Sequence, residues 1–246
     1  MASKINRIRN SNNYHTWNEP AERLVLYADI MGFKSRVMEN NHDVLRDDIF
    51  RFYSAWQNKM SPFIIADHLR HAQFSDSILI VVNGVDNKMF NLISKAAFCL
   101  MHTAMSNRFP IKGVISQGLF TYDENRELYF GLPLVNAAVL HDEIKYYGIV
   151  VHHSAEATVK AMRDDDNFYL KSKIPLEKGM TSHYHLVWNL VDQTYKHNDI
   201  TEQCNLWLDA IEEQVSGKPR VYIDNTRAVL EQDKMQQPEP KEDVDL

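Results

Sequence analysis

Two acidic residues stand where a metal-binding site could be built. Asp29 directly follows Arg23–Ala28, an apolar run rich in strand-forming residues that predicts a buried strand. Asp76 lies between two further predicted strands, at about 66–74 and 77–82. Alone, each carboxylate is equally compatible with a helix cap or a turn, where Asp is favoured for local reasons. Together, on adjacent strand ends, they could hold two divalent cations, one activating a hydroxyl and one holding a triphosphate.

The segment after Asp29 has the composition of a phosphate-binding turn. It reads Ile30, Met31, Gly32 and Phe33. Gly32 permits a tight turn, in which successive backbone N–H groups can face an anion. We therefore expect this segment to lie beside the phosphates of any nucleotide held by the two carboxylates.

The elements that must position these residues follow a recognisable order. Apolar spacing predicts helices over 41–59 and 88–108, and a strand with two glycines over 111–120. A short strand at 127–130 and a helix at 134–141 follow. The order strand, helix, two strands, helix, strand is the βαββαβ pattern of ferredoxin-like folds, so the predicted fold class is α+β.

The rest of the chain predicts an extension of this core rather than a second domain. Helices are expected at 154–162, 201–215 and 219–231, with strands at 168–171 and 183–190. We divide the chain into an N-terminal arm (1–20), one catalytic domain (21–231) and an acidic tail (232–246). The core of the domain spans about 22–150 and the extension 151–231. The tail, with two prolines and five acidic residues, is expected to be disordered.

Composition and charge exclude several classes of protein. The chain has 246 residues and a net charge of −6, which disfavours nucleic-acid and membrane-surface binding. No apolar stretch approaches the roughly 18 residues of a membrane span, and residues 1–9 have no apolar signal sequence. Two isolated cysteines make neither a disulfide framework nor a zinc site, and the paired histidines lack further ligands. We expect a cytoplasmic protein.

Two later segments complete a pattern that resembles the class III adenylate and guanylate cyclases. The first is the strand Ile111–Gly118, and the second is Gly131–Ala138, which contains Val135-Asn136-Ala137. With the segment at Asp29 and the turn at Asp76, they occur in the order found in that family, over approximately residues 22–150.

The resemblance implies roles for individual residues. Asp29 and Asp76 would bind two ions of Mn²⁺ or Mg²⁺, with the carbonyl of Ile30 completing one site. The backbone of Ile30–Phe33 would bind the phosphates, and Asn136 would orient the ribose. Because the family's domains share their sites between two subunits, a homodimer with two equivalent sites is implied.

The sequence departs from the purine cyclases where the family reads the base and stabilises the transition state. Ala72, beside Gln73, stands at the first base-reading position, and Tyr129 (or Leu128, if the glycines are aligned) at the second. Leu140 stands where the transition-state arginine is expected, which leaves Arg70 and Lys112 as candidates for its role. A tyrosine would shrink the base pocket, and a nearby amide such as that of Gln73 suits a pyrimidine.

In these departures the chain resembles the stand-alone bacterial pyrimidine cyclases of the Pycsar antiphage systems. That resemblance implies conversion of UTP or CTP to a cyclic 3′,5′-monophosphate, which would activate a separate effector. UTP is the favoured substrate and CTP the alternative. A degenerate cyclase domain that binds a nucleotide or a protein without turnover is a second alternative. An RNA-binding module is disfavoured by the acidic composition.

Overall fold

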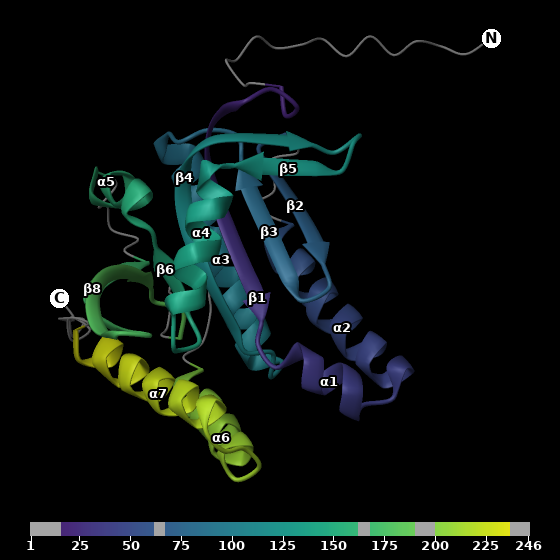
Figure 1. The fold of residues 1–246 in the computed structure, drawn as a ribbon, viewed down its shortest axis with the longest axis vertical. Helices are drawn as coiled ribbons and strands as arrows, with labels where there is room; N and C mark the ends of the chain where they lie inside the picture. Colours follow the sequence, from purple (N-terminus) through teal and green to yellow (C-terminus); the bar gives the residue numbers. More distant parts are fainter. Residues whose placement is uncertain (1–15, 62–66, 162–167, 190–199, 237–246) are drawn as a thin grey trace, which may run out of the picture.

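The computed structural model describes residues 16–61, 67–161, 168–189 and 200–236. In this part of the chain, one eight-stranded sheet has the order β2-β3-β1-β4-β6-β8-β7, with β5 paired to β4 (Figure 1). The strands are β1 (Ala21–Ile30), β2 (Leu69–Phe74), β3 (Ser77–Val82), β4 (Ile111–Asp123), β5 (Leu128–Gly131), β6 (Ile149–Val151), β7 (Tyr169–Leu176) and β8 (Gly179–Leu186). The helices are α1 (Phe33–Glu39), α2 (His42–Met60), α3 (Asn87–Ser106), α4 (Leu132–Glu143), α5 (His153–Ala161), α6 (Thr201–Glu212) and α7 (Lys218–Gln236).

The first four strands confirm the predicted ferredoxin-like core. β1 lies between β3 and β4 and is antiparallel to both, while β2 pairs with β3 at the edge. β6 then adds to β4 in parallel, and the β7–β8 hairpin continues the sheet on that side. The mixed α+β class and the strand and helix extension after the core are therefore as predicted.

The two faces of the sheet are covered by different helices. On one face, Leu24 and Leu26 of β1 pack with α2 and α3 in the largest hydrophobic cluster. On the other face, Tyr27 packs against a smaller cluster that includes Ala137 and Leu140 of α4. Because side chains alternate along a strand, Tyr27 and Asp29 share a face, so Asp29 lies on the α4 side.

Local sequence explains the main helices and the closeness of β1 and β4. The Asp86 side chain caps α3 by accepting a hydrogen bond from the Met89 amide at 2.9 Å. In α2, the buried residues Leu45, Phe52, Trp56 and Met60 recur at helical spacing. A Cβ at Gly113 would lie 2.9 Å from both the Ala28 Cβ and the Tyr27 carbonyl, so glycine allows β4 to lie close to β1 beside Asp29.

Several elements differ from the predictions. The strand β6 and the helix α1 were not predicted, because three and seven residues carry too little periodic signal. β8 begins at Gly179 and ends at Leu186, rather than spanning 183–190. The helix α7 continues to Gln236, so residues 232–236 of the predicted tail are helical. Asp233 is buried there and lies 3.2 Å from His185, so this end of α7 packs against β8.

The end of the predicted N-terminal arm packs on its own chain. The buried Arg23 donates to the carbonyls of Thr16, Trp17 and Phe120 at 3.0, 3.1 and 2.7 Å. Residues 1–15 lie outside the described part of the chain. In the described part, no helix combines the length and the apolar character that crossing a bilayer requires.

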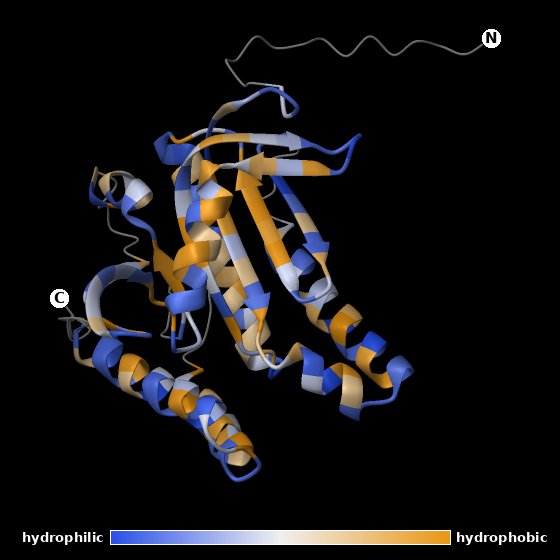
Figure 2. Ribbon diagram, viewed as in Figure 1, coloured by the Kyte–Doolittle hydropathy of each residue, from blue (hydrophilic) through white to orange (hydrophobic). Residues whose placement is uncertain are grey.

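The C-terminal helices α6 and α7 lie beside the sheet on the side of β6 and β8 (Figure 1). Figure 2 shows hydrophobic residues concentrated in the central strands and in α4, whereas hydrophilic and hydrophobic residues alternate along α7. α7 thus packs as an amphipathic helix, with Ile223, Thr226 and Leu230 among its buried residues.

Candidate active site

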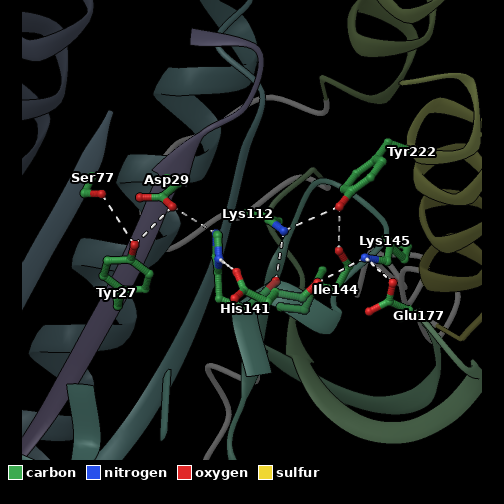
Figure 3. Close-up of polar contacts among 10 residues, drawn as sticks. Tyr27, Asp29, Ser77, Lys112, His141, Ile144, Lys145, Glu177 and Tyr222 are labelled. Atoms are coloured by element: carbon green, nitrogen blue, oxygen red, sulfur yellow. Dashed lines mark hydrogen bonds and ion pairs between the residues drawn. The ribbon is translucent and has the colours of Figure 1, made fainter. Parts of the chain in front are cut away.

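The carboxylate of Asp29 lies at the end of the central strand, between two neighbouring strands. In the sheet register Asp29 is opposite Ser77 of β3 and Lys112 of β4. The Tyr27 hydroxyl donates to Asp29 Oδ2 at 3.1 Å and lies 3.4 Å from Ser77 Oγ (Figure 3). Asp29 Oδ1 is buried and has no hydrogen-bond partner among the described residues. A buried carboxylate oxygen without a partner is costly unless a cation or a donor occupies the space beside it.

The backbone brings Asp76 next to this strand end. Asp76 follows Ser75, whose positive φ of 56° forms the tight turn between β2 and β3. The amide of Ile30 donates to the Asp76 carbonyl at 3.0 Å, which fixes the turn beside β1. Asp29 and Asp76 are 47 positions apart in the chain. The backbone nevertheless brings these two predicted metal ligands next to each other.

The residues present fit a divalent cation bound together with a substrate. No group of three or more His, Cys, Asp or Glu side chains that could hold a metal occurs in the described part of the chain. Mg²⁺ in nucleotide enzymes is typically held by one or two carboxylates together with substrate phosphates, so a third protein carboxylate is not required. The unpartnered Oδ1 of Asp29 is the observation that supports such an ion.

Fewer backbone N–H groups of the predicted phosphate-binding turn are available to a phosphate than expected. Gly32 has a φ of 72°, as expected for a tight turn, and is the N-cap residue of α1. The Ile30 amide, however, is taken by Asp76, and the Met31 amide donates to the Pro110 carbonyl at 2.7 Å. Those two N–H groups hold the turn in place and cannot face a phosphate. Gly32 and Phe33 are left as the candidates for phosphate contact.

His141, which sequence reasoning did not single out, lies against Asp29. Its ring packs edge-on to Tyr27, with centroids 5.3 Å apart, and its Nε2 lies 3.5 Å from Asp29 Oδ2. Burial lowers the pKa of the imidazole and the Lys112 ammonium lowers it further, while the Asp29 carboxylate opposes the shift. No local motif marks His141, because its role depends on where the end of α4 meets β1.

Lys112 is buried, with 5% of its surface exposed. Its Nζ donates to the His141 carbonyl at 2.9 Å and to the Tyr222 hydroxyl at 3.4 Å (Figure 3). Burial, and the nearby Lys145, lower the pKa of the Lys112 ammonium. Lys112 thus places a cation in the neighbourhood of Asp29.

The predicted base-reading residues line a cavity of about 480 Å³. Gln73 and Tyr129 both line it, together with Tyr27, Ser77 and Leu134. The cavity therefore adjoins the hydrogen bond between Tyr27 and Asp29. Tyr129 stacks at a tilt on Tyr122, with ring centroids 4.3 Å apart, so its ring is held against the sheet. The volume lies within the range of small-molecule sites.

Two predicted residues are not gathered into this group. Arg70 lies toward the other end of β2, with its guanidinium over the Trp17 ring and 3.7 Å from Glu124. Asn136 is half-buried on α4 and shares a helix face with the exposed Leu132 and Val139. Leu140, at the expected arginine position, is buried in the cluster beneath α4.

The fold is similar to that of nucleotide cyclase domains of known structure. The guanylate cyclase domain from Catenaria anguillulae, solved in complex with GTP, matches with a TM-score of 0.51 and 13% identity, over 68% of this chain and 96% of that chain. A non-canonical dimeric guanylyl cyclase domain from the aquatic fungus Blastocladiella emersonii matches with a TM-score of 0.52 and 13% identity, over 70% and 99%. A rhodopsin-guanylyl cyclase core with converted specificity, in complex with ATPαS, matches with 0.53 and 12%, over 68% and 95%.

At this level of identity the similarity concerns the fold. No protein-family model and no curated protein matches the sequence. The predicted cyclase fold is thus confirmed, and the roles of individual residues are proposals.

Proposed function

We propose that the chain is a nucleotidyl cyclase that converts UTP to cyclic 3′,5′-UMP and diphosphate. The observation that carries this proposal is the unpartnered, buried Oδ1 of Asp29, next to the turn that bears Asp76. Both lie at the end of the central strand of a cyclase fold, beside a cavity of nucleotide size.

The protein's own part in the reaction is to position and to stabilise charge. Asp29, Asp76 and the Ile30 carbonyl would hold two divalent ions, Mn²⁺ or Mg²⁺, which supply activation of the 3′-hydroxyl and neutralisation of the triphosphate. The 3′-oxygen attacks the α-phosphorus and diphosphate leaves in line, so no covalent enzyme intermediate is needed. Gly32 and Phe33 contact the phosphates through backbone N–H groups. Lys112 takes the role of a nearby cation in place of the family's arginine.

The cavity supports a pyrimidine rather than a purine. Tyr129 fills space where the purine cyclases place a smaller base-reading residue, and Gln73 offers an amide donor and acceptor to the edge of a base. UTP is favoured, and CTP is the alternative, since an amide can pair with either base.

A homodimer with shared sites is supported by an exposed apolar surface. Its members come from β4, β5 and α4, consecutive in the chain, and each is more than half exposed: Leu119, Leu128, Phe130, Leu132, Val135 and Val139. Exposed apolar residues on these three contacting elements favour an interaction site. Asn136 shares the α4 face with Leu132 and Val139. If a second copy packs on this face, the Asn136 side chain would point into the site of that copy, toward the ribose.

The resemblance to the Pycsar cyclases supports a biological role as well. In this role the protein is cytoplasmic, makes its cyclic nucleotide during phage infection, and acts through a separate effector that binds the product. One alternative function is a degenerate cyclase domain that binds a nucleotide or protein without turnover. Leu140 favours this alternative, because its buried apolar side chain cannot replace an arginine.

Incubation with an equimolar mixture of ATP, GTP, CTP and UTP, with Mn²⁺ or Mg²⁺, tests the proposal. Mass spectrometry of the products should identify cyclic UMP as the main product. Cyclic CMP would support the alternative pyrimidine substrate, and a cyclic purine would overturn the base assignment. No cyclic product from any nucleotide would favour the degenerate domain.

A further inference from the structure

The C-terminal helix α7 reaches the candidate active site through one side chain. The Tyr222 hydroxyl donates to the Ile144 carbonyl at 2.9 Å and accepts a hydrogen bond from Lys112 Nζ at 3.4 Å. A phenol can donate once and accept, and both capacities are used here. Figure 3 shows Tyr222 on the opposite side of Lys112 from His141. Residues 110 positions apart in the chain are thereby joined.

The next contact connects Lys112 to the residue beside Asp29. Lys112 Nζ donates to the His141 carbonyl at 2.9 Å, near the C-terminal end of α4, where a cation is also favoured by the helix dipole. The imidazole of the same residue packs on Tyr27 and lies 3.5 Å from Asp29 Oδ2. A continuous series of contacts therefore runs from Tyr222 on α7 through the Lys112 amine, the backbone and ring of His141, and on to the Asp29 carboxylate.

A structural role alone does not explain a buried ammonium at this position. Lys112 is 5% exposed and makes two hydrogen bonds, although an ammonium has three donors. An apolar side chain of similar length would fill the same space without the cost of burying a charge. The placement is explained if the charge serves the phosphates of a nucleotide held near Asp29 through the proposed metal ions, and the charge must then be held in a fixed position.

We propose that α7 is part of the active site and that Tyr222 is a positioning residue, which fixes the Lys112 amine and the end of α4 relative to Asp29. The inference rests on the proposed cyclase function. It gives the C-terminal extension a specific task at the metal and phosphate site.

The same helix supplies a matched control. Asn225 donates from Nδ2 to the Lys145 carbonyl at 2.8 Å, so it ties α7 to the same loop without contacting Lys112. Tyr222→Phe removes only the hydroxyl and keeps the ring, which stacks on Tyr147 with centroids 5.6 Å apart. Asn225→Ala removes a hydrogen bond of similar length and should affect docking of α7 alone.

The test compares Tyr222→Phe, Asn225→Ala, Lys112→Met and the double variant Tyr222→Phe/Lys112→Met. Each is measured for affinity for 3′-deoxy-UTP with Mn²⁺ by calorimetry, for kcat and KM with UTP, and for thermal unfolding. The 3′-deoxy nucleotide lacks the attacking hydroxyl and cannot cyclise. Tyr222→Phe should weaken the affinity for 3′-deoxy-UTP and lower kcat/KM about tenfold, as loss of a supporting hydrogen bond at a metal site commonly does. Asn225→Ala should leave both unchanged, and Tyr222→Phe should add nothing in the Lys112→Met background.

The proposal is overturned if Tyr222→Phe behaves like Asn225→Ala, or if the effects of Tyr222→Phe and Lys112→Met multiply. A wild-type protein that yields no cyclic product from any nucleotide refutes the proposed function instead. The affinities for 3′-deoxy-UTP then decide the inference by themselves, because they do not depend on turnover.

Discussion

At the scale of single residues, the two oxygens of Asp29 have different surroundings. Oδ2 accepts from Tyr27 and faces His141, while Oδ1 has no partner among the described residues. The position of Asp29 at a strand end could be predicted from the apolar run before it. Tyr27 could also have been found, since residues two apart on a strand share a face. His141 and Tyr222 could not, because their proximity depends on how α4 and α7 pack.

Lys112 gives a prediction about stability and pH at this scale. Its pKa is lowered by burial from an ordinary value of 10.5, so folding favours its neutral form. The associated stability is present above pH 10.5 and is lost as pH falls through the lowered pKa of the folded state. Relative to Lys112→Met, the wild type should therefore gain thermal stability as pH is raised from 7 toward 10.5.

Thermal unfolding of both proteins across this pH range measures the difference directly. At pH 7 we expect Lys112→Met to be at least as stable as the wild type, because it removes a buried charge. A difference in melting temperature that stays constant, or that moves against the wild type as pH rises, would contradict the burial argument.

At the scale of elements, the close contact of β1 and β4 determines where Asp29 lies. A Cβ at Gly113 would meet Ala28 Cβ and the Tyr27 carbonyl at 2.9 Å, one residue from Asp29. We predict that Gly113→Ala lowers the free energy of unfolding by about 1–3 kcal/mol through overpacking, and lowers cyclase activity more than tenfold. Ala97→Gly, a cavity-forming change elsewhere in the core, serves as a control that loses stability and keeps activity.

Denaturant unfolding and product formation at a temperature where both variants are folded provide the comparison. Equal activity in Gly113→Ala and the wild type would show that the spacing of β1 and β4 does not determine the site.

Most of the core elements could be predicted because their periodicity is long and regular. α3, with its cap at Asp86 and its apolar spacing, is an example, as is the β3 run Ser77–Val82. The three-residue β6 escaped prediction because its place in the sheet comes from pairing with β4. The end of α7 was placed too early because the acidic composition after 231 concealed the buried contact of Asp233 with His185.

At the scale of the whole molecule, the apolar surface on β4, β5 and α4 predicts sites shared between two copies. If Asp29 comes from one subunit and Asn136 from the other, then Asp29→Asn and Asn136→Ala each inactivate both sites of a homodimer. A heterodimer of the two variants keeps one intact site. Random pairing should therefore restore about a quarter of wild-type activity, given two equivalent sites in a symmetric dimer.

Co-expression of the two variants with different affinity tags, followed by an assay of the mixture, checks this prediction. Each variant expressed alone is the control. No recovery in a mixture shown to contain heterodimers would place Asp29 and Asn136 in the same subunit's site, or outside a shared site altogether.

The central claim, that Asp29 and Asp76 hold the catalytic ions, is tested most directly by comparing Asp29→Asn, Asp76→Asn and Asp224→Asn. The last changes an exposed carboxylate on α7, 66% exposed at its side chain, and is the matched control. With UTP and Mn²⁺, both site variants should lose cyclic UMP formation by at least a hundredfold and bind Mn²⁺ more weakly, while Asp224→Asn behaves like the wild type. Cyclic UMP formation by Asp29→Asn or Asp76→Asn at the wild-type rate would contradict the account.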